Sequence, residues 1–267
     1  MTYSRIVQYG NITETFDYEK DIKPHRKKYK SSLTKKRQAE LRKLAGYKRT
    51  AFSIKRAKRN FFRLCHANNC KAQSIHFFTL TLAHDANYSD CLRYIYIFFN
   101  KLKKYVSSVS DSQISYIGVP ELTKKGRYHF HLLIYNLPTR IAGDPIFIRK
   151  YSRKLKQYYL QPTTTERFTR NLQRLWGRGF LDVCPTTGVT AGIAGYMAKY
   201  MGKFLANPTN EAKRAYNCSR NVEKIRSYGS KSLVDYFEDL VPDKLPERSA
   251  EYQVPFLGTC KFKRFQV

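Results

Sequence analysis

Tyr128-His129-Phe130-His131-Leu132-Leu133-Ile134 is the stretch that decides the fold of this chain. Two histidines flank one apolar residue inside an apolar run, which is typical of a β-strand with its side-chain period of two. On such a strand both imidazoles share one face, and Phe130 lies on the other. The sequence therefore predicts a strand with a metal-binding face and an apolar face.

A second stretch, Tyr196-Met197-Ala198-Lys199-Tyr200-Met201-Gly202-Lys203, repeats a Tyr-x-x-Lys unit after four residues. On a helix, Tyr200 lies one turn beyond Tyr196, and Lys203 lies one turn beyond Lys199. The repeat therefore predicts a helix over 188–205 that presents two equivalent phenols on one stripe.

The composition of the chain points to a polyanionic partner. The 267 residues carry a formal net charge of +30, and 21 of them are tyrosines. A large positive charge attracts phosphate backbones, and aromatic rings beside lysine and arginine suit base stacking. No stretch approaches the roughly 20 apolar residues of a membrane-spanning helix, and no signal peptide is evident. We therefore expect a cytoplasmic protein that binds nucleic acid and no membrane.

The spacing of the cysteines and the absence of a phosphate-binding motif argue against other classes of protein. Six cysteines are scattered without C-x-x-C pairs or zinc-finger spacing, so we expect free thiols. No G-x-x-x-x-G-K-[ST] motif occurs, so the sequence gives no sign of a built-in NTPase or of a small-molecule cofactor.

Lysine and arginine dominate residues 23–63, where Glu40 stands nearly alone as an acid. Apolar residues recur there at loosely helical spacing, and Gly46 predicts a break between two helices. A solvated helical face would explain any single cation. The uniform charge of the whole run favours an arm that lies on nucleic-acid backbone.

The middle of the chain predicts alternating strands and helices. The expected strands are 75–82, 113–120, 127–135 and 179–184, with helices over about 89–106 and from Phe168 to Trp176 before the tyrosine helix. The second and third strands form a hairpin, with Glu121 near its turn and close to both histidines. This β-α-β-β-α-β order is that of an α+β, ferredoxin/RRM-like antiparallel sheet.

The remaining segments carry weaker patterns. Residues 1–22 are expected to form a lead-in, and 137–163 an excursion with a short basic helix near 148–159. Beyond 206 we expect a strand near 215–220, a helix near 230–239 and no second domain. The expected organisation is a basic helical arm (1–70), a central domain (71–230) and a C-terminal extension (231–267).

His129, His131 and Glu121 form a donor set for one divalent cation. Mixed nitrogen and oxygen ligands at an open site suit Mg²⁺ or Mn²⁺ in phosphoryl transfer, although zinc also accepts them. His76 and His84 flank the first strand, where a structural role or a DNA contact is favoured over metal ligation.

Tyr196 and Tyr200 are candidate nucleophiles. A phenol has an ordinary pKa near 10, so it attacks only when a neighbour stabilises its phenolate or accepts its proton. Lys199 and Lys203 supply nearby positive charge. Gly192, Gly195 and Gly202 each weaken the helix by up to about 1 kcal/mol relative to alanine, which predicts that this helix approaches the sheet or a backbone closely.

Three groups of residues resemble the motifs of the HUH-superfamily rolling-circle replication initiators. These groups are Phe78-Thr79-Leu80-Thr81, then Glu121 with His129-Phe130-His131, then the Tyr196 to Lys203 repeat. The likeness is greatest to the gene A type replication proteins of small single-stranded DNA phages, and it spans about residues 56–222. Relaxases of the mobilisation type have these motifs in a different order, with the tyrosine before the histidines, and this chain does not show that order.

The resemblance implies an HUH endonuclease fold and a specific reaction. One tyrosine would attack origin DNA in single-stranded form, leaving a 5′-phosphotyrosine and a free 3′-hydroxyl that primes synthesis. The second tyrosine would cleave the regenerated site and allow strand joining. His129, His131 and Glu121 would carry over as metal ligands, Tyr196 and Tyr200 as nucleophiles and Lys199 as charge stabiliser. A host helicase and polymerase would be partners.

Two alternatives remain open at the sequence level. A transposase or plasmid initiator of the same superfamily would use one tyrosine, with Tyr200 merely structural. A non-catalytic RNA-binding or single-stranded DNA-binding module would share the element order and the charge, with sheet aromatics that stack bases.

Overall fold

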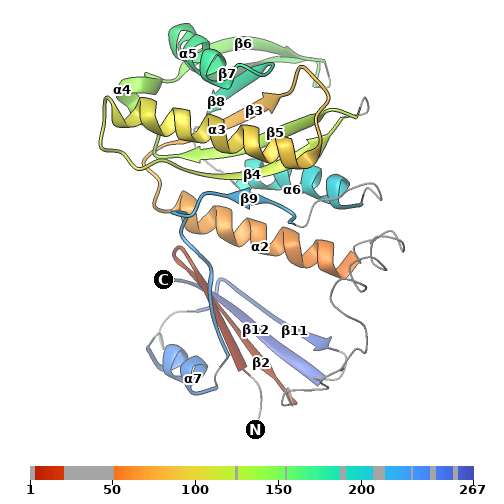
Figure 1. Cartoon of the computed structure of the whole chain (residues 1–267). Coiled ribbons are helices and arrows are strands. Elements are labelled where there is room, and N and C mark those ends of the chain that lie inside the picture. Colours follow the sequence, from red (N-terminus) through yellow and green to blue (C-terminus); the bar gives the residue numbers. More distant parts are fainter. Residues whose placement is uncertain are drawn as a thin grey trace. The chain divides into compact units, whose positions relative to one another are not determined.

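The computed structural model of the chain describes residues 4–20, 51–123, 126–153, 155–186, 191–206, 214–229, 231–240, 245–254 and 258–267. The chain divides into two compact units, one of Lys48–Val222 and one of Met1–Tyr47 with Glu223–Val267. Each unit contains a five-stranded sheet whose neighbouring strands are all antiparallel (Figure 1). The predicted α+β class with antiparallel sheets is confirmed.

The unit of residues 48–222 follows the predicted order of elements. Its elements are α2 (Ala51–Asn69), β3 (Ile75–Thr81), α3 (Tyr88–Ser107), β4 (Ser115–Leu122), β5 (Tyr128–Tyr135), α4 (Thr139–Ala142), β6 (Ile146–Ser152), β7 (Gln157–Thr163), α5 (Glu166–Trp176), β8 (Leu181–Pro185), α6 (Ala191–Ala206) and β9 (Asn217–Cys218). The sheet has the strand order β8-β3-β5-β4-β9. The predicted hairpin is β4 with β5, and the predicted tyrosine helix is α6.

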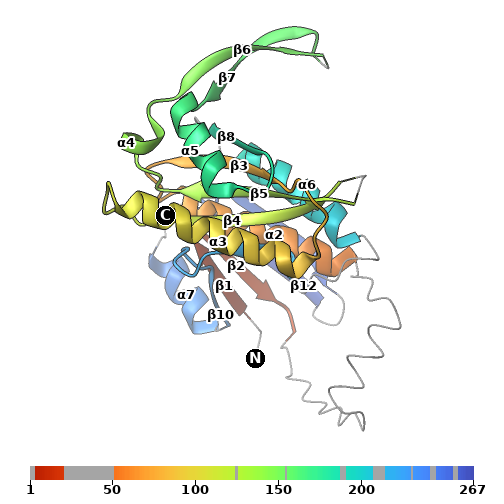
Figure 2. The same cartoon turned by 45° about the horizontal axis from the view of Figure 1, so that its top comes forward.

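Helices cover both faces of this sheet (Figures 1 and 2). On one face Phe78 of β3 packs against Phe98 of α3, whose ring meets Trp176 of α5 edge-on. On the other face lies α6, which also contacts β4 and α2. The tyrosine helix therefore lies against the sheet, as the sequence predicted.

The other unit is formed from both ends of the chain. Its sheet has the order β10-β1-β2-β12-β11, from β1 (Ser4–Tyr9), β2 (Ile12–Tyr18), β10 (Arg226–Tyr228), β11 (Arg248–Val254) and β12 (Gly258–Gln266). The N-terminal lead-in and the C-terminal extension are thus parts of one sheet. The unit boundaries fall after residues 47 and 222, whereas the sequence placed them after 70 and 230.

This sheet has a small core of its own. Ile6 and Phe265 pack with Val234 and Phe237 of α7 (Lys231–Leu240). At its centre the buried carboxylate of Glu14 accepts a hydrogen bond from Tyr9, 2.7 Å away, while Arg264 donates to the same oxygen. The strand expected near 215–220 and the helix expected near 230–239 are present as β9 and α7.

Two further predictions concern the basic arm and the excursion. Residues 23–50 of the predicted arm lie outside the described residues, and its remainder forms α2 inside the larger unit. The helix predicted near 148–159 is wrong. β-branched and aromatic residues such as Ile146, Ile148 and Tyr159 instead form the antiparallel pair β6 and β7.

A tight turn fixes the end of β3 that carries the site. Gly179 has φ +144, and a Cβ there would overlap the carbonyl oxygen of Thr81 and lie 2.6 Å from the nitrogen of Ala83. The same turn is bonded to β3 through Thr81 N to Phe180 O and Ala83 N to Arg178 O. A side chain at residue 179 cannot be accommodated without shifting this backbone.

We expect Gly179→Ala to lower the free energy of unfolding by roughly 2–4 kcal/mol, because overpacking and a positive φ both oppose a side chain there. Urea denaturation followed by circular dichroism measures this change. Gly192→Ala is the matched control, since nothing lies within 4 Å of its Cβ position. That control should leave stability unchanged or raise it by up to about 1 kcal/mol. Equal effects of the two substitutions would contradict the explanation that residue 179 has no room for a side chain.

Candidate active site

The sheet register places the predicted metal-ligating residues on one face. His131 of β5 lies opposite Thr79 of β3, and His129 lies between Thr81 of β3 and Glu121 of β4. Residues paired directly across antiparallel strands project to the same side, so these side chains share the face that carries α6. Because pairing continues through Pro120, the strand has no bulge that would turn Glu121 away.

His131 has a partner at each ring nitrogen. Its Nε2 lies 2.9 Å from Oε2 of Glu121, and its Nδ1 lies 3.3 Å from Oγ1 of Thr79. Burial lowers the pKa of His131, although the hydrogen bond and charge of Glu121 act in the opposite direction. Burial thus favours the neutral ring, which is the form that binds a metal.

Both tyrosines of α6 reach this histidine. The ring centroid of His131 lies 4.8 Å from that of Tyr200 and 5.8 Å from that of Tyr196. The hydroxyl of Tyr200 donates to that of Tyr196 at 2.8 Å. The four predicted residues Glu121, His131, Tyr196 and Tyr200 are therefore brought to one place by β4, β5 and α6.

The phenol of Tyr196 resists ionisation in this setting. Burial raises its pKa, and the neighbouring phenol of Tyr200 and the charge of Glu121 raise it further. The residue is nevertheless 45% exposed, so part of it is accessible to a substrate. Attack by Tyr196 requires a positive charge or a proton acceptor close to its oxygen.

Lys199 and Lys203 take different positions from each other. The Nζ of Lys203 lies 5.6 Å from the ring centroid of Tyr200. Lys199 and Lys203 also line a groove between α6 and α2, together with Lys58 and Phe62. Both lysines of the repeat thus face α2, and Lys203 also lies beside the ring of Tyr200.

The glycines of α6 face α2 and not the sheet, which corrects the reason expected for them. A Cβ at Gly202 would lie 2.6 Å from Nζ of Lys58, and one at Gly195 would lie 3.9 Å from the ring of Phe62. Gly192 has no neighbour within 4 Å. The close approach of α6 to the sheet is made by aromatic side chains instead.

Sequence reasoning gave no role to two residues of the site, although Thr79 lies in one of the three motifs. Thr79 orients His131, and Phe77 stacks on the His131 ring at 5.5 Å with an interplanar angle of 10° while meeting Tyr196 edge-on. Their signal is the period of two along β3, which sets Phe77, Thr79 and Thr81 on one face.

The residues fit a divalent cation as donors, although they are not arranged as a finished three-ligand cluster. Within the described parts of the chain, no three His, Cys, Asp or Glu side chains are grouped to hold a metal ion. Glu121 and His131 Nε2 instead meet each other, and His129 is the cross-strand neighbour of Glu121. One carboxylate and two imidazoles are the ligand types that Mn²⁺ and related cations accept.

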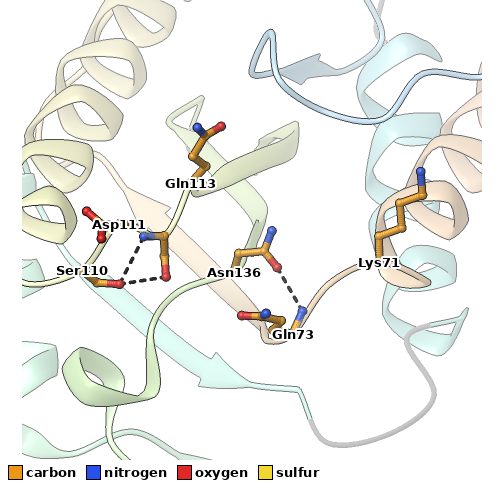
Figure 3. Close-up of a pocket in the computed structure, with 7 residues that line it drawn as sticks. Lys71, Gln73, Ser110, Asp111, Gln113 and Asn136 are labelled. Carbon is orange, nitrogen blue, oxygen red and sulfur yellow. Dashed lines mark hydrogen bonds between the residues drawn. The ribbon is translucent and has the colours of Figure 1, made fainter.

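A polar pocket lies at the other end of the same sheet, where β3 begins and β5 has just ended (Figure 3). It is lined by Lys71, Gln73, Ser110, Asp111, Ser112, Gln113 and Asn136. Oδ1 of Asn136 accepts from the backbone of Gln73 at 3.0 Å, and the hydroxyls of Ser110 and Ser112 are 2.9 Å apart. These bonds join loops, and none of the predicted site residues lines this pocket.

Residues 75–205 match the family model of the replication-associated proteins of the ORF2 and phage gene 2 protein type. This part of the chain belongs to that replication-associated protein family. No curated protein and no solved structure shows significant similarity to the chain. The resemblance to replication initiators that the three motifs carry is thus confirmed at the level of the family.

The family match runs from the first residue of β3 to the penultimate residue of α6. It contains all the predicted site residues, and it excludes α2 and the smaller unit. None of the described helices is long and apolar enough to cross a membrane. The six cysteines all lie in the described residues, and none of them forms a disulfide bond.

His76 differs from the site histidines, because it lies on the apolar face of β3 with Phe78. It is 5% exposed, its Nδ1 has no hydrogen-bond partner among the described residues, and burial lowers its pKa to about 4. Neither a role in lining the site nor a DNA contact fits this position. Below pH 6.5 the unfolded chain binds a proton here that the folded chain does not.

We expect this ring to reduce stability as the pH falls from 6.5 toward 4, by up to about 3 kcal/mol at full effect. His76→Leu should remove that part of the pH dependence of the unfolding free energy, measured by urea denaturation across this range. His84→Leu, at an exposed histidine, is the control and should keep the slope of the unchanged chain. The same slope in the His76→Leu protein would refute the explanation.

Proposed function

We propose that the chain is a rolling-circle replication initiator of the HUH type, which nicks and joins single-stranded origin DNA through phosphotyrosine intermediates. The observation that carries the proposal is the meeting of two phenols with His131 and Glu121 across the interface of α6 and the sheet. Apart from the inserted α4, β6 and β7, the elements from β3 to β8 follow the β-α-β-β-α-β order of a split βαβ sheet, which supports the HUH fold.

The proposed reaction is an in-line displacement at phosphorus. The hydroxyl oxygen of Tyr196 or Tyr200 bonds to the phosphorus, and the bond from phosphorus to the 3′ oxygen breaks. The phenol loses its proton, and the departing 3′ oxygen gains one and becomes the free 3′-hydroxyl. The 5′ phosphate remains on the tyrosine until a hydroxyl attacks it and restores a phosphodiester.

The short distance between the two phenols supports their alternating use. Their oxygens are 2.8 Å apart, so each can reach a phosphate held at nearly the same position. The phenol that does not attack remains within hydrogen-bond distance of the one that does. This arrangement supports a second cleavage by the second tyrosine after one round of synthesis.

Glu121, His129 and His131 are the residues that would hold Mg²⁺ or Mn²⁺. Bound there, the cation would polarise the phosphate and offset the negative charge of Glu121. The contact with Thr79 supports ligation by His131, because Thr79 can accept a hydrogen bond from Nδ1 if Nε2 serves as ligand. Lys203, beside Tyr200, adds positive charge, and Lys199 lies one turn away on the same helix.

The nucleophile assignment is tested with single-stranded origin DNA, Mn²⁺ and the detection of protein-DNA adducts that survive SDS. Tyr196→Phe combined with Tyr200→Phe should lower adduct formation by roughly 10³-fold or more. Each single substitution should still yield adducts but should fail in the transfer to a second cleaved site. Tyr96→Phe, at a 65% exposed tyrosine of α3, is the matched control.

The outcomes separate the alternatives. Normal second cleavage by Tyr200→Phe would reduce the site to one nucleophile, as in a transposase or plasmid initiator. Tight DNA binding without any adduct in the unchanged protein would leave a non-catalytic nucleic-acid-binding module.

The metal assignment predicts that Glu121→Gln keeps the fold but weakens Mn²⁺ binding, by roughly 10–100-fold. The amide retains a hydrogen-bonding group for His131 and removes the charge. Isothermal titration with Mn²⁺ measures this directly, and a chelator should abolish adducts in the unchanged protein. Glu166→Gln, at an exposed carboxylate of α5, provides the comparison. Equal Mn²⁺ affinity in both variants would remove Glu121 from the ligand set.

A further inference from the structure

The β6 and β7 strands form an exposed two-stranded ribbon between α4 and α5, here called the basic ribbon (Ile146–Thr163). Figure 2 shows it curving away from the sheet of its own unit. All residues of β6 up to Tyr151 are exposed, as are Gln157 to Leu160 of β7. A two-stranded hairpin without a packed face is marginally stable in water, so this one is suited to a partner.

Each face of the ribbon carries large apolar side chains and a cation. The register pairs Tyr151 with Tyr158, whose ring centroids are 5.1 Å apart, and Arg149 lies 4.3 Å from the Tyr158 ring on the same face. The opposite face pairs Lys150 with Tyr159. Neither face is therefore a core face, and neither is purely polar.

The charge of the ribbon is of one sign. Between residues 146 and 163 the sequence has the cations Arg149, Lys150, Arg153, Lys154 and Lys156 and no aspartate or glutamate. Exposed tyrosines include Tyr151 at 51% and Tyr158 at 59%. Cations interleaved with exposed aromatic rings are the composition of nucleic-acid-binding surfaces, and a phosphate backbone supplies the missing counter-charge.

We propose that the basic ribbon is a duplex-DNA-binding arm that enters the major groove beside the single-stranded substrate. The major groove, about 12 Å wide, admits a two-stranded β-ribbon. A ribbon inserted in a groove has both of its faces against the groove walls, where Arg149 and Lys150 on opposite faces each meet a phosphate backbone. A single strand stacked on aromatic rings would use one face and leave the other exposed.

This inference rests on the proposed function only in taking DNA as the ligand, because the ribbon contains none of the candidate catalytic residues. It assigns a division of labour within one unit. The phenols of α6 act on a single strand, and the ribbon holds the neighbouring duplex.

The test compares full-length proteins for binding to a mixed-sequence duplex of roughly three helical turns across a salt series. Arg149→Ala with Lys150→Ala should weaken duplex binding about tenfold or more at physiological salt and reduce the slope of log K against log salt by about 2. Lys101→Ala with Lys104→Ala removes the same charge from exposed positions of α3 and should change neither quantity.

A second pair of variants separates the rings from the charge. Tyr151→Ser with Tyr158→Ser should weaken duplex binding at every salt concentration and leave the slope unchanged. Tyr96→Ser is its exposed control. All these side chains are at the surface, so thermal denaturation should show the same Tm for every variant.

The outcomes distinguish duplex binding by the ribbon from a general effect of net charge and from binding of a protein partner. Equal loss of binding in the ribbon and α3 charge variants would overturn the proposal, since it would show a general effect of net charge. Unchanged duplex affinity in both ribbon variants would also overturn it and would assign the exposed rings to a protein partner. Adduct formation on a short single strand should persist in the ribbon variants. Absence of adducts in every protein, with ribbon-dependent duplex binding intact, would defeat the proposed chemistry and leave the ribbon standing.

Discussion

The contact between α6 and the histidine face of the sheet is the interaction on which the site depends. Tyr200 packs against His131, and Tyr196 meets Tyr200 at 4.6 Å between ring centroids. Aromatic pairs of this kind contribute about 0.5–1.5 kcal/mol each beyond their buried area. On the same helix Met197 and Met201 are fully buried. Apolar packing thus fixes the helix, and the phenol oxygens converge before any substrate is bound.

Local periodicity explains why the main parts of the site could be predicted. A period of two sets His129 and His131 on one face of a strand, and a period near four sets Tyr196 above Tyr200 on a helix. The sequence placed Glu121 close to both histidines, but only the folded structure shows that its carboxylate bonds to His131, whereas its direct cross-strand neighbour is His129. The partnership of Phe77 and Thr79 with His131 likewise depends on pairing between strands 52 or more residues apart.

The smaller unit shows where a single sequence stops being informative. Its first hairpin had a readable signal, since Gly10 and Asn11 form a two-residue turn between two runs of β-forming residues. The rest of this sheet had no such signal, because β2 pairs with β12 at the far end of the chain. The strands of the basic ribbon were not predicted for a different reason. Its cations interrupt the apolar alternation on both faces, so neither the strand period nor the helix period dominates.

The attraction of a phosphate to the protein and the activation of a tyrosine have different electrostatic causes. The net charge of +30 draws phosphate over distances up to the Debye length of about 8–10 Å and beyond at low salt, but it does not ionise a particular phenol. At contact range, burial and Glu121 both hold Tyr196 in its neutral form. A neutral resting phenol is a poor nucleophile toward stray phosphodiesters. Burial does most to raise the pKa of Tyr196, the Tyr200 phenol adds to it, and the charge of Glu121 adds further. Under the proposed chemistry that same carboxylate would hold a cation, which would offset its part of the effect when metal and DNA are bound together.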